Sequence, residues 1–184
     1  MKIGTKSLLF GVHQVLLHPL MVAWAWKKLY GFPWDFRLWV CFIVHDWGYW
    51  GAPEMDGPIG DQHPRLGAQI VHKLLDRNNK WDWYNLCIHH SRFLAAKSGN
   101  LPSRLCMADK LSVTLEPWWF YLPRAWASGE LKEYMNSSKP EGKHGHLKLK
   151  TDTSKGWYQS FQVSMQKYVG GHKDGQKDLI TPVK

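Results

Sequence analysis

Residues 38–48 read LWVCFIVHDWG, an apolar run that ends on the adjacent pair His45-Asp46. Cys41, Phe42 and His45 recur at the three- and four-residue spacing of one helix face, which predicts a helix that buries this face. His45 and Asp46 then lie at the inner, C-terminal end of that helix. Because an aspartate is seldom buried without a partner, we expect this pair to bind a metal ion.

Two further histidines each stand directly before a proline, at His18-Pro19 and His63-Pro64. Proline is best tolerated at the first position of a helix, so each histidine is predicted at a helix N-terminus. The Gly- and Pro-rich segment 47–62 is predicted to be a loop that borders the site.

The last candidate ligands lie on two later helices. The sequence predicts a helix over about 81–96 that carries His89 and His90 near its middle. It predicts another over about 102–115 that carries Asp109. Adjacent helical positions differ by a turn of about 100°, so the sequence does not decide which of the two histidines points inward.

The predicted fold class is all-α, because no alternation of polar and apolar residues is long enough to require a strand. We expect a compact helical bundle with a C-terminal helical appendage and a basic tail. The catalytic core is assigned to 1–135, and the polar loop, amphipathic helix and tail to 136–184. With 184 residues and 44% hydrophobic content, the chain can form one well-buried core.

The cysteines indicate a reducing, cytoplasmic setting. Cys41, Cys87 and Cys106 are odd in number and lie in apolar helical patterns, which disfavours a disulfide framework. Polar residues interrupt the apolar run over 8–26, so we expect neither a membrane span nor a membrane partner.

Charge and aromatic residues give weaker indications about partners. Much of the formal charge of +9 comes from 139–184, which favours a solvated basic tail and makes a nucleic-acid partner unlikely. The 12 tryptophans are expected mostly in the core, but Trp47, Tyr49 or Trp50 should contact the site or its substrate. The aromatic residues between Tyr30 and Trp50 are also suited to a homodimer face.

The proposed ligands are imidazole nitrogens and carboxylate oxygens. This donor set suits Mn, Fe, Co, Ni or Zn better than Mg or Ca alone. The set is large enough for two ions, and the aspartate of a His-Asp pair can bridge them. Two ions would lower the pKa of a shared water and give a hydroxide that can attack phosphorus.

The ordered set resembles the HD-domain superfamily of metal-dependent phosphohydrolases. The resemblance covers roughly residues 13–115. The matching elements, in chain order, are His18, His45-Asp46-Trp47-Gly48, His63-Pro64-Arg65-Leu66-Gly67-Ala68, His89-His90 and Ala108-Asp109-Lys110.

This resemblance implies a helical bundle around a binuclear metal site. The implied ligands are His18, His45, Asp46 and Asp109 for a first ion, with His63 and one or both of His89 and His90 for a second. The implied activity is hydrolysis of a nucleotide or a small phosphate monoester or diester, with Asp46 as the bridging catalytic residue.

Three basic residues are candidates for holding the anionic phosphate of the substrate: Arg65, Arg92 and Lys110. A guanidinium pairs bidentately with phosphate oxygens, whereas an ammonium acts as a point charge. The same side chains can equally brace carboxylates such as Asp61 or Asp109.

Two other functions remain open from the sequence. One is a mixed-valence di-iron oxygenase of the HD type, which would consume oxygen instead of releasing phosphate. The other is a non-catalytic HD module that binds a nucleotide.

Overall fold

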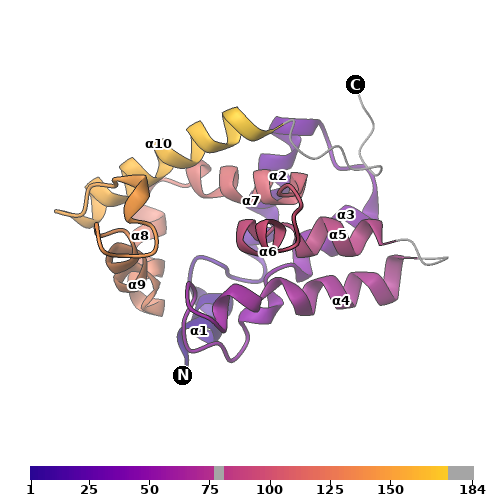
Figure 1. The fold of residues 1–184 in the computed structure, drawn as a ribbon, viewed down its shortest axis with the longest axis horizontal. Helices are drawn as coiled ribbons and strands as arrows, with labels where there is room; N and C mark the ends of the chain where they lie inside the picture. Colours follow the sequence, from indigo (N-terminus) through magenta and orange to yellow (C-terminus); the bar gives the residue numbers. More distant parts are fainter. Residues whose placement is uncertain (77–80, 174–184) are drawn as a thin grey trace.

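The computed structural model describes residues 1–76 and 81–173, and in these ranges the chain is helical without a β-strand. This confirms the all-α prediction. Figure 1 shows the arrangement of the helices. Their bounds are α1 Ile3–Phe10, α2 Leu17–Tyr30, α3 Phe36–Val44, α4 Pro64–Leu75, α5 Asp82–Ile88, α6 Arg92–Lys97, α7 Arg104–Ser112, α8 Trp118–Ser128, α9 Glu130–Ser137 and α10 Ser154–His172. Short 3-10 helices are η1 Trp47–Tyr49, η2 Gly60–Gln62, η3 Val113–Leu115 and η4 Gly145–Leu147.

The main core is formed by the inner faces of α2, α3, α4, α5 and α7. α2 packs along α7, and α4 packs along α5. Trp26 and Phe42 are fully buried in this core, with ring centroids 5.5 Å apart. The free cysteines Cys41 and Cys87 are buried in the same cluster, as small apolar side chains.

A second apolar cluster lies under the C-terminal half of the chain. Tyr121 of α8 stacks on Tyr158 of α10, and Trp157 is buried beside them. α10 crosses the molecule over α7 and α8 (Figure 1) and packs against both. The predicted amphipathic last helix is therefore confirmed, whereas the basic tail over 174–184 lies outside the described residues. The division at residue 135 stays a prediction.

The helix predicted over 81–96 is wrong in its middle. The chain leaves helical geometry after Ile88, and His89 and His90 occupy a turn between α5 and α6. Ser91 begins the next helix, because its Oγ accepts a hydrogen bond from the backbone N–H of Leu94 at 3.3 Å. Ser91 was the sequence signal for this break.

Two glycines permit close contacts around the site. A Cβ on Gly67 of α4 would lie 2.4 Å from the carbonyl oxygen of Val44, and one on Gly48 would lie 2.0 Å from that of His63. The C-terminal end of α3 and the start of α4 can therefore approach closely, which brings His45 and His63 to the same region.

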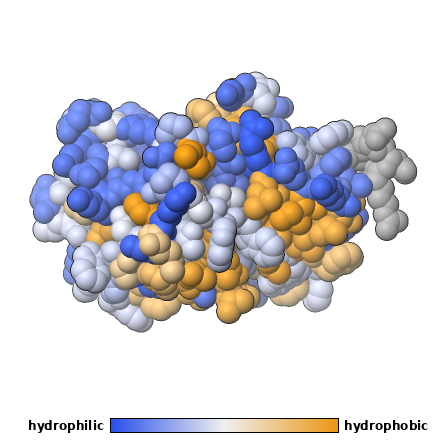
Figure 2. All heavy atoms as spheres, turned by 90° about the horizontal axis from the view of Figure 1, so that it is seen from below, coloured by the Kyte–Doolittle hydropathy of each residue, from blue (hydrophilic) through white to orange (hydrophobic). Residues whose placement is uncertain are grey.

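Several large apolar side chains remain on the surface. Phe36 and Ile43 of α3 and Leu66 and Leu74 of α4 are each more than 40% exposed, and the two helices pack together. Figure 2 shows hydrophobic side chains gathered on the right half of the face seen from below. The homodimer stays a prediction. Among the described residues, every helix is too short or too polar to cross a membrane.

Candidate metal centre

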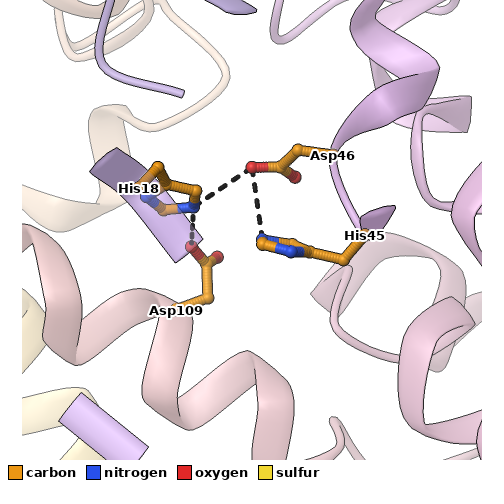
Figure 3. A group of neighbouring side chains, drawn as sticks. All are labelled: His18, His45, Asp46 and Asp109. Carbon is orange, nitrogen blue, oxygen red and sulfur yellow. Dashed lines mark ion pairs between the residues drawn. The ribbon is translucent and has the colours of Figure 1, made fainter. Parts of the chain in front are cut away.

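Four buried side chains converge from three parts of the chain (Figure 3). His18 Nε2 lies 3.2 Å from Asp46 Oδ2 and 3.2 Å from Asp109 Oδ1. His45 Nε2 also lies 3.2 Å from Asp46 Oδ2. His18 belongs to the first turn of α2, Asp109 to α7, and His45 and Asp46 directly follow α3. The predicted positions at helix ends are confirmed for His18, His45 and Asp46, and Asp109 lies within a helix, as predicted.

The other oxygen of Asp46 belongs to a second group. Asp46 Oδ1 lies 3.4 Å from His63 Nε2 and 3.3 Å from His90 Nε2. These two nitrogens are 2.9 Å apart. His63 stands directly before α4, as predicted, and His90 comes from the turn after α5. Asp46 therefore directs one carboxylate oxygen to each group.

Backbone carbonyls fix the tautomers of three of these histidines. The Nδ1 atoms of His45, His63 and His90 lie at 2.9, 2.7 and 2.6 Å from the carbonyl oxygens of Phe42, Gly60 and Cys87. In each ring Nδ1 must carry the proton to donate it, which leaves Nε2 of the neutral ring with its lone pair exposed. Metal-ligating histidines use the same arrangement, because it orients the ring.

The unpaired atoms of the first group fit a cation. His18 Nε2, His45 Nε2 and Asp46 Oδ2 are buried and make no hydrogen bond of acceptable geometry with the described residues. Buried polar atoms ordinarily have a partner. Three such atoms that face one another at 3.2 Å are satisfied together by one ion, so the residues present fit a divalent metal.

Protonation in the metal-free protein reflects the same electrostatics. Burial lowers the pKa of His18, but its contacts with Asp109 and Asp46 outweigh burial and raise that pKa to about 10. Burial lowers the pKa of His63 and of His90, so both rings are neutral at pH 7. The metal-free centre therefore combines a protonated His18 with neutral rings at His63 and His90 and with carboxylates that stay ionised.

The two aspartates of the site are held ionised despite their burial. Burial raises the pKa of Asp46, yet its electrostatic interactions and contacts with His45, His18 and His90 bring that pKa well below its usual range. Burial also raises the pKa of Asp109, but the charge of Lys110 and contact with His18 bring that pKa well below its usual range. Lys110 Nζ donates to Asp109 Oδ2 at 2.7 Å and so orients that ligand.

The structure separates the two adjacent histidines. His90 belongs to the second group, whereas His89 Nε2 lies 3.2 Å from Ser98 Oγ, outside both groups. The sequence did not decide between His89 and His90, because the prediction placed both of them in one continuous helix. The turn between α5 and α6 sends the two rings in different directions.

Of the three candidate phosphate-binding residues, the structure places two at the site and one away from it. Arg92 and Lys110 both line a cavity that reaches His18 and Asp109. The Arg92 guanidinium lies 5.0 Å from the ring centroid of Tyr168 and has no carboxylate partner among the described residues. Arg65 is exposed, does not line this cavity, and donates from Nε to Gln62 Oε1 at 2.6 Å.

The volume of the cavity that is open to a water-sized molecule is about 140 Å³. Tyr49 lines it and stacks on the ring of His63, with centroids 3.9 Å apart. The expectation that an aromatic residue after His45-Asp46 borders the site is confirmed for Tyr49, whereas Trp47 and Trp50 are exposed.

Sequence reasoning missed one buried network beside the site. His13 lines the cavity, and its Nδ1 lies 2.9 Å from Glu130 Oε1. Glu130 is fully buried and also accepts hydrogen bonds from Ser7, Ser128 and the backbone of Val12. Glu130 is far from His13 in sequence, and a single acidic residue in an amphipathic helix gives no signal of burial.

No family model matches the chain, and neither a curated protein nor a solved structure matches it. The geometry of the site therefore carries the functional interpretation.

Proposed function

We propose that this protein is a metal-dependent phosphohydrolase of the HD-domain type. The observation that carries the proposal is the pair of His/Asp groups that share Asp46, beside a cavity lined by Arg92 and Lys110. The histidine nitrogens and carboxylate oxygens that would bind a metal ion lie at one wall of the cavity. Basic side chains suited to an anion lie at the same end.

The donor atoms divide into two sets around Asp46. His18, His45, Asp46 Oδ2 and Asp109 would hold one divalent ion, and Asp46 Oδ1, His63 and His90 would hold another. An ion held there acts as a Lewis acid on phosphoryl oxygens and increases the acidity of water. Nitrogen and oxygen donors in this proportion suit Mn, Fe, Co, Ni or Zn.

The remaining residues bind and orient a phosphate ester. Arg92 can donate two parallel hydrogen bonds to phosphate oxygens, because no described carboxylate competes for its guanidinium. Lys110 adds a positive charge while it keeps Asp109 in place. Burial raises the pKa of Tyr49 well above its usual value, so its hydroxyl stays protonated and can donate to the substrate.

The reaction is a simple hydrolysis. The water oxygen forms a bond to phosphorus, the bond from phosphorus to the ester oxygen breaks, and one water proton ends on the released alcohol. Fixed positive charge stabilises the negative charge that gathers on the phosphoryl oxygens in the transition state.

The test is phosphate release from metal-loaded protein. The screen covers alkyl and aryl phosphates and nucleotides, with Mn, Co, Ni, Zn or Fe, and uses Asp46→Asn as the control. We expect release with at least one ester and metal, and its loss in the variant. Bound metal without phosphate release from any ester contradicts the proposal, and oxygen consumption by an iron-loaded form would replace it with the oxygenase.

A further inference from the structure

The cavity extends well beyond the metal centre into the C-terminal half of the molecule. Its other wall is formed by Tyr121 of α8 and Leu147 of η4, and by three residues of α10: Trp157, Phe161 and Met165. Tyr121 and Trp157 belong to the second apolar cluster, and Phe161 packs against it. The ring of Trp157 stacks on that of Phe161 with centroids 5.4 Å apart. The proposed hydrolysis makes no use of this wall.

The polar atoms on this wall are mostly occupied within the protein. Trp157 Nε1 donates to Ser138 Oγ at 3.0 Å, and Ser138 Oγ donates to the carbonyl oxygen of Tyr134 at 2.7 Å. The Tyr134 hydroxyl donates to Glu130 at 3.3 Å. The Tyr121 hydroxyl has no hydrogen-bond partner among the described residues. It is therefore the one described donor on this wall that is available to a ligand.

These features disfavour a nucleoside in the cavity. A nucleobase is recognised through several donors and acceptors on its edge, and its buried polar atoms are costly when unpaired. The described lining residues include no Asn or Gln, and Asp56 and His144, which also line the cavity, pair with each other at 3.3 Å. The carboxylate of Glu116, which also lines the cavity, is paired with Arg124.

We infer that the cavity takes an amphiphilic phosphate, with its phosphate beside Arg92 and Lys110 and an apolar alkyl or aryl group against Trp157, Phe161 and Met165. The identity of the anionic group as a phosphate, and its hydrolysis, rest on the proposed function. The apolar group occupies the wall that α10 supplies, so the C-terminal helix determines the substrate class.

Burial of the apolar group gives a quantitative expectation. Complete burial of one methylene group strengthens binding about fourfold, from roughly 0.8 kcal/mol per methylene. An open cavity buries the alkyl chain of the ligand incompletely, so we expect affinity to rise about twofold per methylene group. A binding site that contacts the phosphate alone would show no dependence on chain length.

Titration calorimetry of the Mn-loaded protein with methyl-, butyl- and octylphosphonate tests this inference. Their carbon–phosphorus bond resists hydrolysis, so binding is measured apart from activity. We expect affinity to rise with the length of the alkyl chain, and octylphosphonate to bind more tightly than a non-hydrolysable phosphonate analogue of adenosine monophosphate. Equal affinity across the series, or tighter binding of the nucleotide analogue, overturns the inference.

A variant pair locates the apolar group. Phe161→Ala should weaken the binding of octylphosphonate about tenfold and leave the binding of methylphosphonate unchanged, because Phe161 is placed against the alkyl chain of the ligand and away from its phosphonate. Val163→Ala is the matched control, since Val163 lies on the same helix and is 64% exposed. An equal effect of the two substitutions, or none from Phe161→Ala, contradicts the placement. If the variant does not fold, the chain-length series on the unmodified protein still decides the inference.

The outcomes separate this inference from the proposed function. Chain-length dependence without hydrolysis of any ester supports the cavity assignment and removes the phosphohydrolase. Hydrolysis of esters without chain-length dependence supports the phosphohydrolase and removes the amphiphilic substrate.

Discussion

The Nε2 atoms of His63 and His90 face each other 2.9 Å apart, although each ring uses its Nδ1 proton on a backbone carbonyl. Asp46 Oδ1 lies 3.4 and 3.3 Å from the same two nitrogens. Two lone pairs and a carboxylate oxygen repel one another at this distance unless a proton or a metal ion lies among them, and burial disfavours the proton because it lowers the pKa of both rings. This is the strongest structural argument for metal binding.

The adjacent histidines provide a matched test of this geometry. His90→Gln should weaken binding of divalent metal by about 100-fold, because even residues that only orient ligands are worth 10- to 100-fold. His89→Gln should change it less than threefold, since His89 contacts Ser98 instead. Competition with a chelating dye measures both. Equal losses in the two variants would contradict the assignment.

Asp46→Asn should lower the affinity for metal more than the loss of any single histidine does. The residue presents one oxygen to each group, and its amide replacement carries no charge. We expect metal affinity to fall by at least about 100-fold and phosphate release to disappear. Metal content measured by elemental analysis checks the first point. Glu141→Gln, at an exposed position, is the control and should retain all bound metal.

Arg92→Gln should lower kcat/KM for phosphate release by about 100-fold, equivalent to about 2.7 kcal/mol of transition-state stabilisation. Its guanidinium lines the cavity without a described carboxylate partner. Lys97→Gln removes a positive charge from the exposed end of the same helix and should leave kcat/KM within about twofold. Arg65→Gln should behave like the Lys97 variant. Steady-state kinetics on one ester distinguishes a local contact from a general effect of charge.

The buried pair of His13 and Glu130 should make stability depend on pH. Burial lowers the pKa of His13, but the bond to Glu130 raises it above 6.5 overall. Burial raises the pKa of Glu130, but the bond to His13 brings it below 4.5. The contribution of Glu130 is present above pH 4.5 and is lost as pH falls through its lower folded pKa. That of His13 is present below pH 6.5 and is lost as pH rises through its higher folded pKa.

Glu130→Gln should therefore cost most between about pH 4.5 and 6.5, by about 3 kcal/mol of unfolding free energy. The difference from the unmodified protein should shrink on both sides of this window. Urea unfolding of metal-free protein across pH measures it. A difference that does not vary with pH would show that the pair is not ionised as described.

Local patterns predicted most of the candidate metal centre. Proline after His18 and after His63 marked two helix starts, and the apolar spacing before His45 marked a helix end. These are short-range signals, and all three histidines reach the centre. Asp109 was placed by its position one turn after a buried leucine.

Long-range relationships could not be read from the sequence in the same way. The cavity wall at Trp157 and Phe161 depends on how α10 crosses α7 and α8. The helical repeat of α10 shows which face is apolar but not what it contacts. His90 was undecided for a local reason, because α5 ends at Ile88 and Ser91 begins α6, which places both histidines in a turn.

The most direct test of the metal centre is anomalous X-ray scattering from crystals of the Mn-loaded protein. The account predicts one peak among His18, His45, Asp46 and Asp109, and a second beside His63 and His90, with Asp46 between them. Absence of a peak at both groups, with manganese bound elsewhere or not at all, would contradict the central claim.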